Sequence, residues 1–135
     1  GVTKLRTAMA ETDAGLIFAN FVDFDTLYGH RNDVTGYAAN LERFDEHLSG
    51  VLVELRPGDL LVVTADHGND PSTPSTDHSR EYVPLLVAGA HVRPGADLGT
   101  RDSFADLGQT IAENFGVGPL THGTSFLEDI VADYP

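Results

Sequence analysis

Two consecutive patterns, a long amphipathic stripe and a short apolar run behind it, constrain the fold of this chain most. Apolar residues recur at three- and four-residue steps from Val34 to Leu55, which predicts one long helix with Asp33 as its N-cap. The continuous apolar run 60–65 then predicts a buried strand after a break at 56–59 that contains Pro and Gly. A helix that covers a buried strand is typical of an α/β domain.

Shorter patterns predict the remaining elements. We expect helices at 3–11 and 104–115 and buried strands at 16–22 and 82–88. The segment 103–106 resembles a capping box, and Gly116 is placed to end the helix that it opens. The order strand, helix, strand, loop, strand, helix predicts an α/β fold with a mostly parallel sheet covered by helices.

Charge and composition narrow the classes of function. The 135 residues include 8 Lys and Arg against 21 Asp and Glu, so the formal net charge is −13. Such an acidic chain is poorly suited to bind nucleic acid phosphates or anionic membranes. The sequence also lacks a membrane-spanning apolar run, a recognisable signal peptide and cysteine. We therefore expect a cytoplasmic protein whose ligand-forming residues are His and carboxylates.

Candidate metal ligands follow two of the expected strands. Asp25 and His30 follow the first, Asp66 and His67 follow the second, and His78 lies eleven residues beyond His67. Ligands of α/β sheets bind outside the carboxyl ends of the strands, so these five side chains are expected at one edge. Carboxylate oxygen together with imidazole nitrogen suits Mn, Fe or Zn, and two ions about 3.5–4 Å apart form a clamp for phosphoryl transfer.

Each of these residues also has a purely structural interpretation. Asp25 can cap a turn, and His30 can bond to a backbone carbonyl. The other histidines, His47, His91 and His122, are interpreted as surface or structural residues. Arg31 and Arg80 lie beside the ligand motifs and either orient an anion or pair with neighbouring carboxylates.

Four segments resemble signatures of the phosphopentomutases, a family of the alkaline phosphatase superfamily. They are VDFDTLYGHRND at 22–33, TADHGNDP at 64–71, TDHSREYVP at 76–84 and GTSFL at 123–127. The resemblance extends from about residue 15 to residue 130, and linked motifs of this kind are far more specific than a single Asp-His pair.

The resemblance implies an enzyme that moves phosphate between the 1- and 5-positions of ribose or 2-deoxyribose. It implies two Mn²⁺ ions and a phosphorylated Thr nucleophile, with a pentose phosphate as substrate. By motif, Asp25, His30 and His78 would hold one ion, and Asp66 and His67 would supply part of the shell of the second.

The same resemblance implies that residues 1–135 are the C-terminal segment of a longer metal-binding core domain. The family's nucleophilic Thr, its remaining metal-binding Asp and its cap domain match nothing in this sequence. We therefore expect a partial alkaline-phosphatase-like core that is inactive alone, pairs with the missing segments of the same enzyme, and tends to self-associate at exposed sheet edges.

Other functions stay open. Cofactor-independent phosphoglycerate mutases are similar, but their first Asp…His pair is usually one residue closer and their last His lies farther away. A phosphatase, phosphodiesterase or sulfatase of the same superfamily is a further alternative. A non-catalytic metal-binding domain is the alternative from a different class.

Overall fold

The computed structural model describes residues 1–132, which form helices and one small sheet. The contacts divide the chain into two compact units. The first unit comprises residues 1–54 and 67–84, and the second comprises residues 55–66 and the segment from 85 onward. Each unit is described by itself below.

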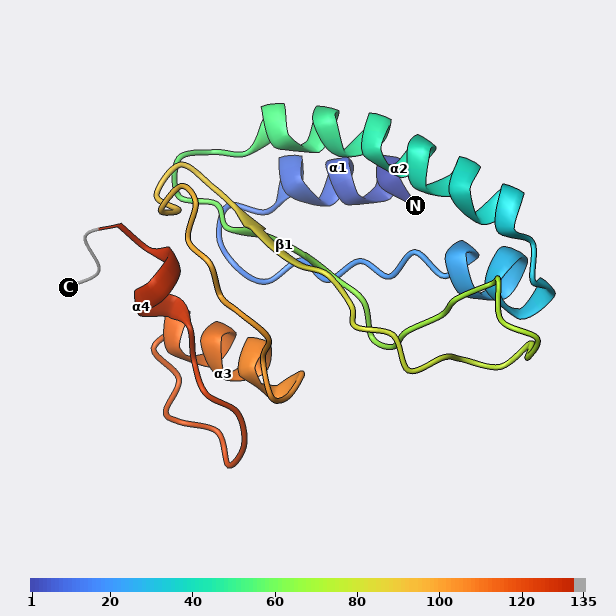
Figure 1. The fold of residues 1–135 in the computed structure, drawn as a ribbon. Coiled ribbons are helices and arrows are strands. Elements are labelled where there is room, and N and C mark those ends of the chain that lie inside the picture. The colour runs from blue at the N-terminus through green and yellow to red at the C-terminus, as the bar shows by residue number, and fades with distance from the viewer. Residues whose placement is uncertain (133–135) are drawn as a thin grey trace. The chain divides into compact units, whose positions relative to one another are not determined.

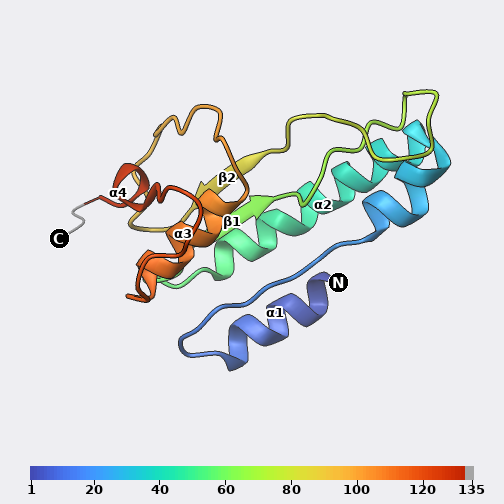
Figure 2. The same cartoon turned by 90° about the horizontal axis from the view of Figure 1, so that it is seen from below.

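The first unit contains two α-helices and a tight double turn. They are α1 (Val2–Glu11), the π-helical turn η1 (Phe24–Tyr28), the 3₁₀ turn η2 (Gly29–Arg31) and α2 (Val34–Glu54). The segment that follows α1 runs back along its length before it reaches η1 (Figures 1 and 2). The guanidinium of Arg6 on α1 donates to the carboxylate of Glu54 at the end of α2, which joins the two helices.

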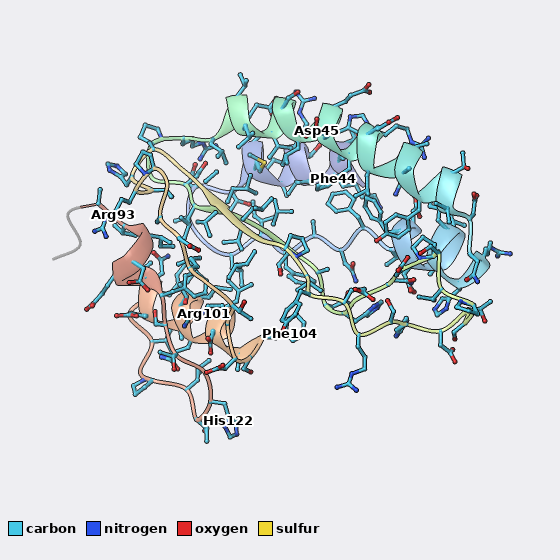
Figure 3. The ribbon with its side chains drawn as sticks, viewed as in Figure 1. Phe44, Asp45, Arg93, Arg101, Phe104 and His122 are labelled. Carbon is cyan, nitrogen blue, oxygen red and sulfur yellow. The ribbon has the colours of Figure 1, made fainter. Side chains whose placement is uncertain are left out.

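The long helix is confirmed, and its N-cap is the predicted one. Asp33 Oδ1 accepts a hydrogen bond of 2.9 Å from the backbone N–H of Gly36, which satisfies one of the free donors at the start of α2. Phe44 points from α2 toward the segment before it in the chain (Figure 3) and meets the rings of Phe21 and Phe24 edge-on, at centroid distances of 5.4 and 5.9 Å. Edge-to-face pairs of this kind add stabilisation beyond their buried area.

The prediction of a buried strand at 16–22 is wrong for this structure. The run forms neither helix nor strand, and Leu16, Phe18 and Val22 are exposed by 63, 85 and 51%. A buried strand needs a hydrogen-bonded neighbour, and among residues 1–132 no segment pairs with this run. Sequence periodicity reports what a segment can bury, not whether a partner is present to cover it.

The second unit holds the sheet, which has two antiparallel strands. Strand β1 (Leu61–Thr64) pairs with β2 (Leu85–Ala88) so that Leu61 faces Ala88 and Thr64 faces Leu85. The run 60–65 is thus confirmed as a strand, and the run 82–88 is a strand only in its second half. The mostly parallel sheet is not found in the described part of the chain, where these two strands lie side by side in opposite directions.

Helix α3 (Ala105–Asn114) confirms the predicted helix but not its capping box. Ser103 Oγ accepts from the N–H of Ala105 at 3.1 Å, whereas the carboxylate of Asp106 turns away to Arg101 and Thr124. A capping box requires the acidic side chain to return to the cap residue, and here a buried ion pair competes for it. The helix ends at Asn114, and Gly116 follows the C-cap residue Phe115 with the positive φ, +63°, expected of a glycine that terminates a helix.

The core of the second unit is built from the C-terminal segment. Phe126, Leu127 and Ile130, the last two on α4 (Leu127–Ile130), are almost fully buried. They pack against β2 through Leu85 and Val87, and against Leu60, which precedes β1. Buried Thr110 Oγ1 accepts from the N–H of Phe126 at 3.0 Å, which ties this segment to α3. None of the helices in the described range has the length and apolar character that crossing a lipid bilayer requires.

Candidate metal centre

The double turn η1–η2 positions Asp25 and His30. Its backbone winds from a π-helical into a 3₁₀ conformation, and the turn ends at Asn32, a residue in the left-handed region at φ +51°. Asn tolerates this conformation better than most side chains. The winding brings the Nε2 atom of His30 to 3.2 Å from Oδ2 of Asp25.

The loop between residues 67 and 79 supplies two further imidazoles. Gly68 and Ser79 form an antiparallel bridge, with the N–H of Ser79 donating to the Gly68 carbonyl at 3.2 Å. A Cβ at position 68 would lie 2.6 Å from the carbonyl oxygen of Ser79, so glycine is needed for this close approach. The bridge places the rings of His67 and His78 face to face, with 3.7 Å between centroids.

The two segments meet at the carboxylate of Asp25. The Nε2 atom of His78 lies 3.2 Å from Oδ1 of Asp25, opposite the oxygen that faces His30. Asp25, His67 and His78 each offer one ligand atom, and these three atoms lie within 4.8 Å of one another. Asp25 and His67 are half-buried and His78 is exposed, so the cluster opens to solvent on one side.

The hydrogen bonding of His30 shows how this cluster suits a cation. Its Nδ1 atom lies 2.6 Å from the carbonyl oxygen of Thr76, which can only accept, so Nδ1 carries the proton. A neutral imidazole then points the lone pair of Nε2 at the carboxylate of Asp25. Two acceptors 3.2 Å apart repel unless a proton or a metal ion lies between them. The donor set of one carboxylate and three imidazoles fits Mn²⁺, Fe²⁺ or Zn²⁺.

The structure therefore brings four of the five expected ligands together in the first unit. Asp25, His67 and His78 group their ligand atoms, and His30 contacts the second oxygen of Asp25, although His67 was expected in a different shell from the other three. Asp66 is exposed and belongs to the stretch 55–66 of the second unit.

Two residues near the cluster were not expected there. Asn69 Nδ2 donates to Asp25 Oδ1 at 2.9 Å. Tyr37 packs its ring on Phe24 as expected of a helix core, but burial, followed by the negative charges of Asp25 and Asp70, raises the pKa of its hydroxyl. The sequence signal for Asn69 is only its place two residues after a candidate ligand.

The remaining candidates are less informative. His122 is exposed at the tip of the loop between α3 and α4 (Figure 3), which agrees with a surface role. His47, Arg31 and Arg80 are also exposed. The carbonyl of His91 accepts a hydrogen bond from the N–H of Ala132 at 2.9 Å, which is a structural contact.

A carboxylate flanked by imidazoles offers the donor set of a metal site, and comparison with known families agrees that this is a metal-binding protein. The profile of the metalloenzyme superfamily matches residues 1–119, so the chain belongs to that superfamily. Phosphopentomutases are among the curated proteins to which it is similar. The chain is 56% identical to the phosphopentomutase of Kosmotoga olearia over 131 residues, which is 97% of this chain and 34% of that protein. It is 57% identical to that of Desulfitobacterium hafniense DCB-2 over 131 residues, again 97% and 34%.

A third relative, the phosphopentomutase of Anaeromyxobacter sp. strain K, is 58% identical over 130 residues, or 96% of this chain and 33% of that protein. The chain thus spans about a third of the length of the curated relatives it matches. The resemblance read from the four motifs is therefore confirmed at the level of similarity to phosphopentomutases.

Proposed function

We propose that Asp25, His30, His67 and His78 hold a divalent metal ion, and that this ion is Mn²⁺. The observation that carries the proposal is the pair of 3.2 Å approaches of imidazole Nε2 atoms to the two oxygens of one carboxylate. Mn²⁺ accepts mixed oxygen and nitrogen shells, whereas Ca²⁺ and Mg²⁺ prefer oxygen alone. Asp66 is proposed as a ligand of a second Mn²⁺ ion.

We further propose that the chain is the metal-binding segment of a phosphopentomutase. The intact enzyme would interconvert ribose 1-phosphate, or its 2-deoxy analogue, with the 5-phosphate. Identities of 56–58% to proteins of that name support the activity, and their threefold greater length supports further segments of the enzyme outside this chain. The nucleophilic Thr and the cap domain implied by the resemblance would lie in those segments. A cytoplasmic location stays a prediction.

In this proposal the metal-binding residues hold and orient the metal ions, and they do not transfer protons. When bound, the ions supply positive charge that polarises a phosphoryl group. Asp25 offers both carboxylate oxygens toward the centre, and the Thr76 carbonyl fixes the tautomer of His30 so that Nε2 faces inward. With a net charge of −13, the chain repels a phosphosugar, and divalent ions reverse the local field at the site.

The variant His78→Ala tests the proposal. Calorimetric titration of the enzyme with Mn²⁺ should show weaker binding, and conversion of ribose 1-phosphate to ribose 5-phosphate should fall by at least about a hundredfold. The matched control is His122→Ala, which removes an exposed imidazole from a loop tip and should leave both unchanged. Wild-type affinity and turnover in His78→Ala would contradict the assignment.

Product identity separates this function from the related hydrolases. A mutase releases ribose 5-phosphate, whereas a phosphatase releases inorganic phosphate from the same substrate. Phosphate release without the 5-phosphate would overturn the proposed activity while leaving the metal centre intact. Metal binding without turnover of any phosphate ester by the intact protein would favour a non-catalytic domain.

A further inference from the structure

We propose that Asn69 is a positioning residue of the metal centre, which orients the carboxylate of Asp25, and that Gly29 is required to leave room for it. This inference rests on the metal site proposed above. It assigns a role to two residues that contribute no ligand atom of their own.

The first observation is the hydrogen bond from Asn69 to Asp25. Nδ2 donates to Oδ1 at 2.9 Å, while the same oxygen lies 3.2 Å from Nε2 of His78. The second oxygen, Oδ2, faces His30 at 3.2 Å. The amide thus holds the carboxylate in a rotation that directs Oδ1 to His78 and Oδ2 to His30. Asp25 is a quarter exposed, so water would compete for Oδ1 if the amide were absent.

The second observation is the fit of Gly29 against Asn69. Gly29 has φ −60° and ψ −60°, which any L-residue can adopt, so its backbone conformation does not require glycine. Space does. A Cβ at position 29 would lie 2.1 Å from Nδ2, 2.7 Å from Cγ and 2.9 Å from Oδ1 of Asn69. Because Gly29 is buried, any side chain there must displace the amide of Asn69.

Together, the two observations indicate that Asn69 and Gly29 jointly support the metal ligands. Asn69 follows His67 and Gly68 in the chain, and Gly29 precedes His30, so each supporting residue is next to, or two positions from, a proposed ligand. Partners that orient ligating carboxylates and imidazoles typically contribute 10- to 100-fold to metal affinity. Loss of the amide should therefore weaken Mn²⁺ binding without removing a ligand.

The test measures Mn²⁺ affinity in the full-length protein by calorimetry, with the electron paramagnetic resonance spectrum of the bound ion as a second readout. Asn69→Ala should raise the Kd by about tenfold or more and change the spectrum of the bound ion. The matched control is Asn114→Ala, at the exposed end of α3, which should change neither. Thermal unfolding of the metal-free proteins shows whether each variant is folded.

A double-mutant cycle with Gly29 makes the test specific. Gly29→Ala alone should raise the Kd by about tenfold, because its methyl group displaces the amide. In the Asn69→Ala background the same substitution should change the Kd less than about twofold, because the space is then free. Strong non-additivity of this kind is the signature of residues in direct contact.

The outcomes are distinguishable. Normal Mn²⁺ affinity in Asn69→Ala, or independent and multiplicative effects of the two substitutions, would overturn the role of Asn69 and leave the metal centre standing. A loss of metal-free stability in Asn69→Ala with an unchanged Kd would also overturn it. A wild-type protein that binds no Mn²⁺ would overturn the proposed metal centre itself, and the positioning role with it.

Discussion

At the scale of single residues, the most consequential charge outside the metal centre is that of Asp106. It is 5% exposed, and its carboxylate accepts from Arg101 Nε at 2.8 Å and from the N–H of Thr124 at 2.9 Å. Asp106→Ala should destabilise the protein by about 3 kcal/mol, because it leaves a partly buried guanidinium and an N–H group without their acceptor. Urea denaturation measures this, and the exposed neighbour variant Asp102→Ala should stay within about 0.5 kcal/mol of wild type. Equal effects of both variants would contradict the buried-pair interpretation.

A second prediction at this scale concerns Asp70 and acid. The hydroxyl of Ser72 donates to Oδ1 of Asp70 at 2.6 Å and its N–H donates at 2.8 Å, and these bonds lower the pKa of Asp70. A pKa that is lower in the folded than in the unfolded state stabilises the fold above the ordinary carboxyl pKa, and this stabilisation is lost as the pH falls through the folded value. Ser72→Ala should raise the pKa of Asp70 toward its usual value, as measured by carboxyl NMR titration. An unchanged titration would show that the hydroxyl does not stabilise the anion.

The identities of the candidate ligands could be predicted from the sequence, but their grouping could not. Asp25, His30, His67 and His78 were recognised because acidic and imidazole side chains follow apolar runs. Which of them share one centre depends on rotations of single side chains, which spacing does not encode. Asn69 was not predicted as part of the site, because an amide donor that orients a ligand has no characteristic sequence motif.

At the scale of elements, the N-cap of α2 is the feature to test. Asp33→Ala should destabilise the protein by about 1 kcal/mol, because the N–H of Gly36 loses its acceptor. Chemical denaturation measures the change, and Asp45→Ala on the exposed face of the same helix is the control. A similar loss from both variants would indicate a general effect of charge on the helix instead of capping.

The same scale shows what sequence periodicity can and cannot predict. The helix Val34–Glu54 follows directly from its apolar stripe, since a pattern sustained over six turns has few other solutions. The run 16–22 consists almost entirely of apolar residues, yet it forms no strand. Strands depend on neighbours that lie far away in sequence, and no local pattern states whether those neighbours are present.

At the scale of the whole molecule, metal binding and stability are coupled. A ligand that binds only the folded state stabilises it by about 2.7 kcal/mol at a concentration of one hundred times its Kd. Mn²⁺ should therefore raise the Tm of the protein by roughly 5–10 °C in differential scanning calorimetry. A chelator should reverse the shift, and His78→Ala should abolish it. A shift of the same size in His78→Ala would assign the stabilisation to ion binding elsewhere on this acidic surface.

The hydrogen bond between Asn69 and Asp25 joins positions 44 apart in the chain, and the contact of His30 with Thr76 spans 46. A loop of that size must close before the ligands can gather, at an entropic cost that grows with the logarithm of its length. We therefore expect the metal ion to bind after this loop has closed. Bound Mn²⁺ should therefore slow the unfolding of the native state and leave the refolding rate unchanged.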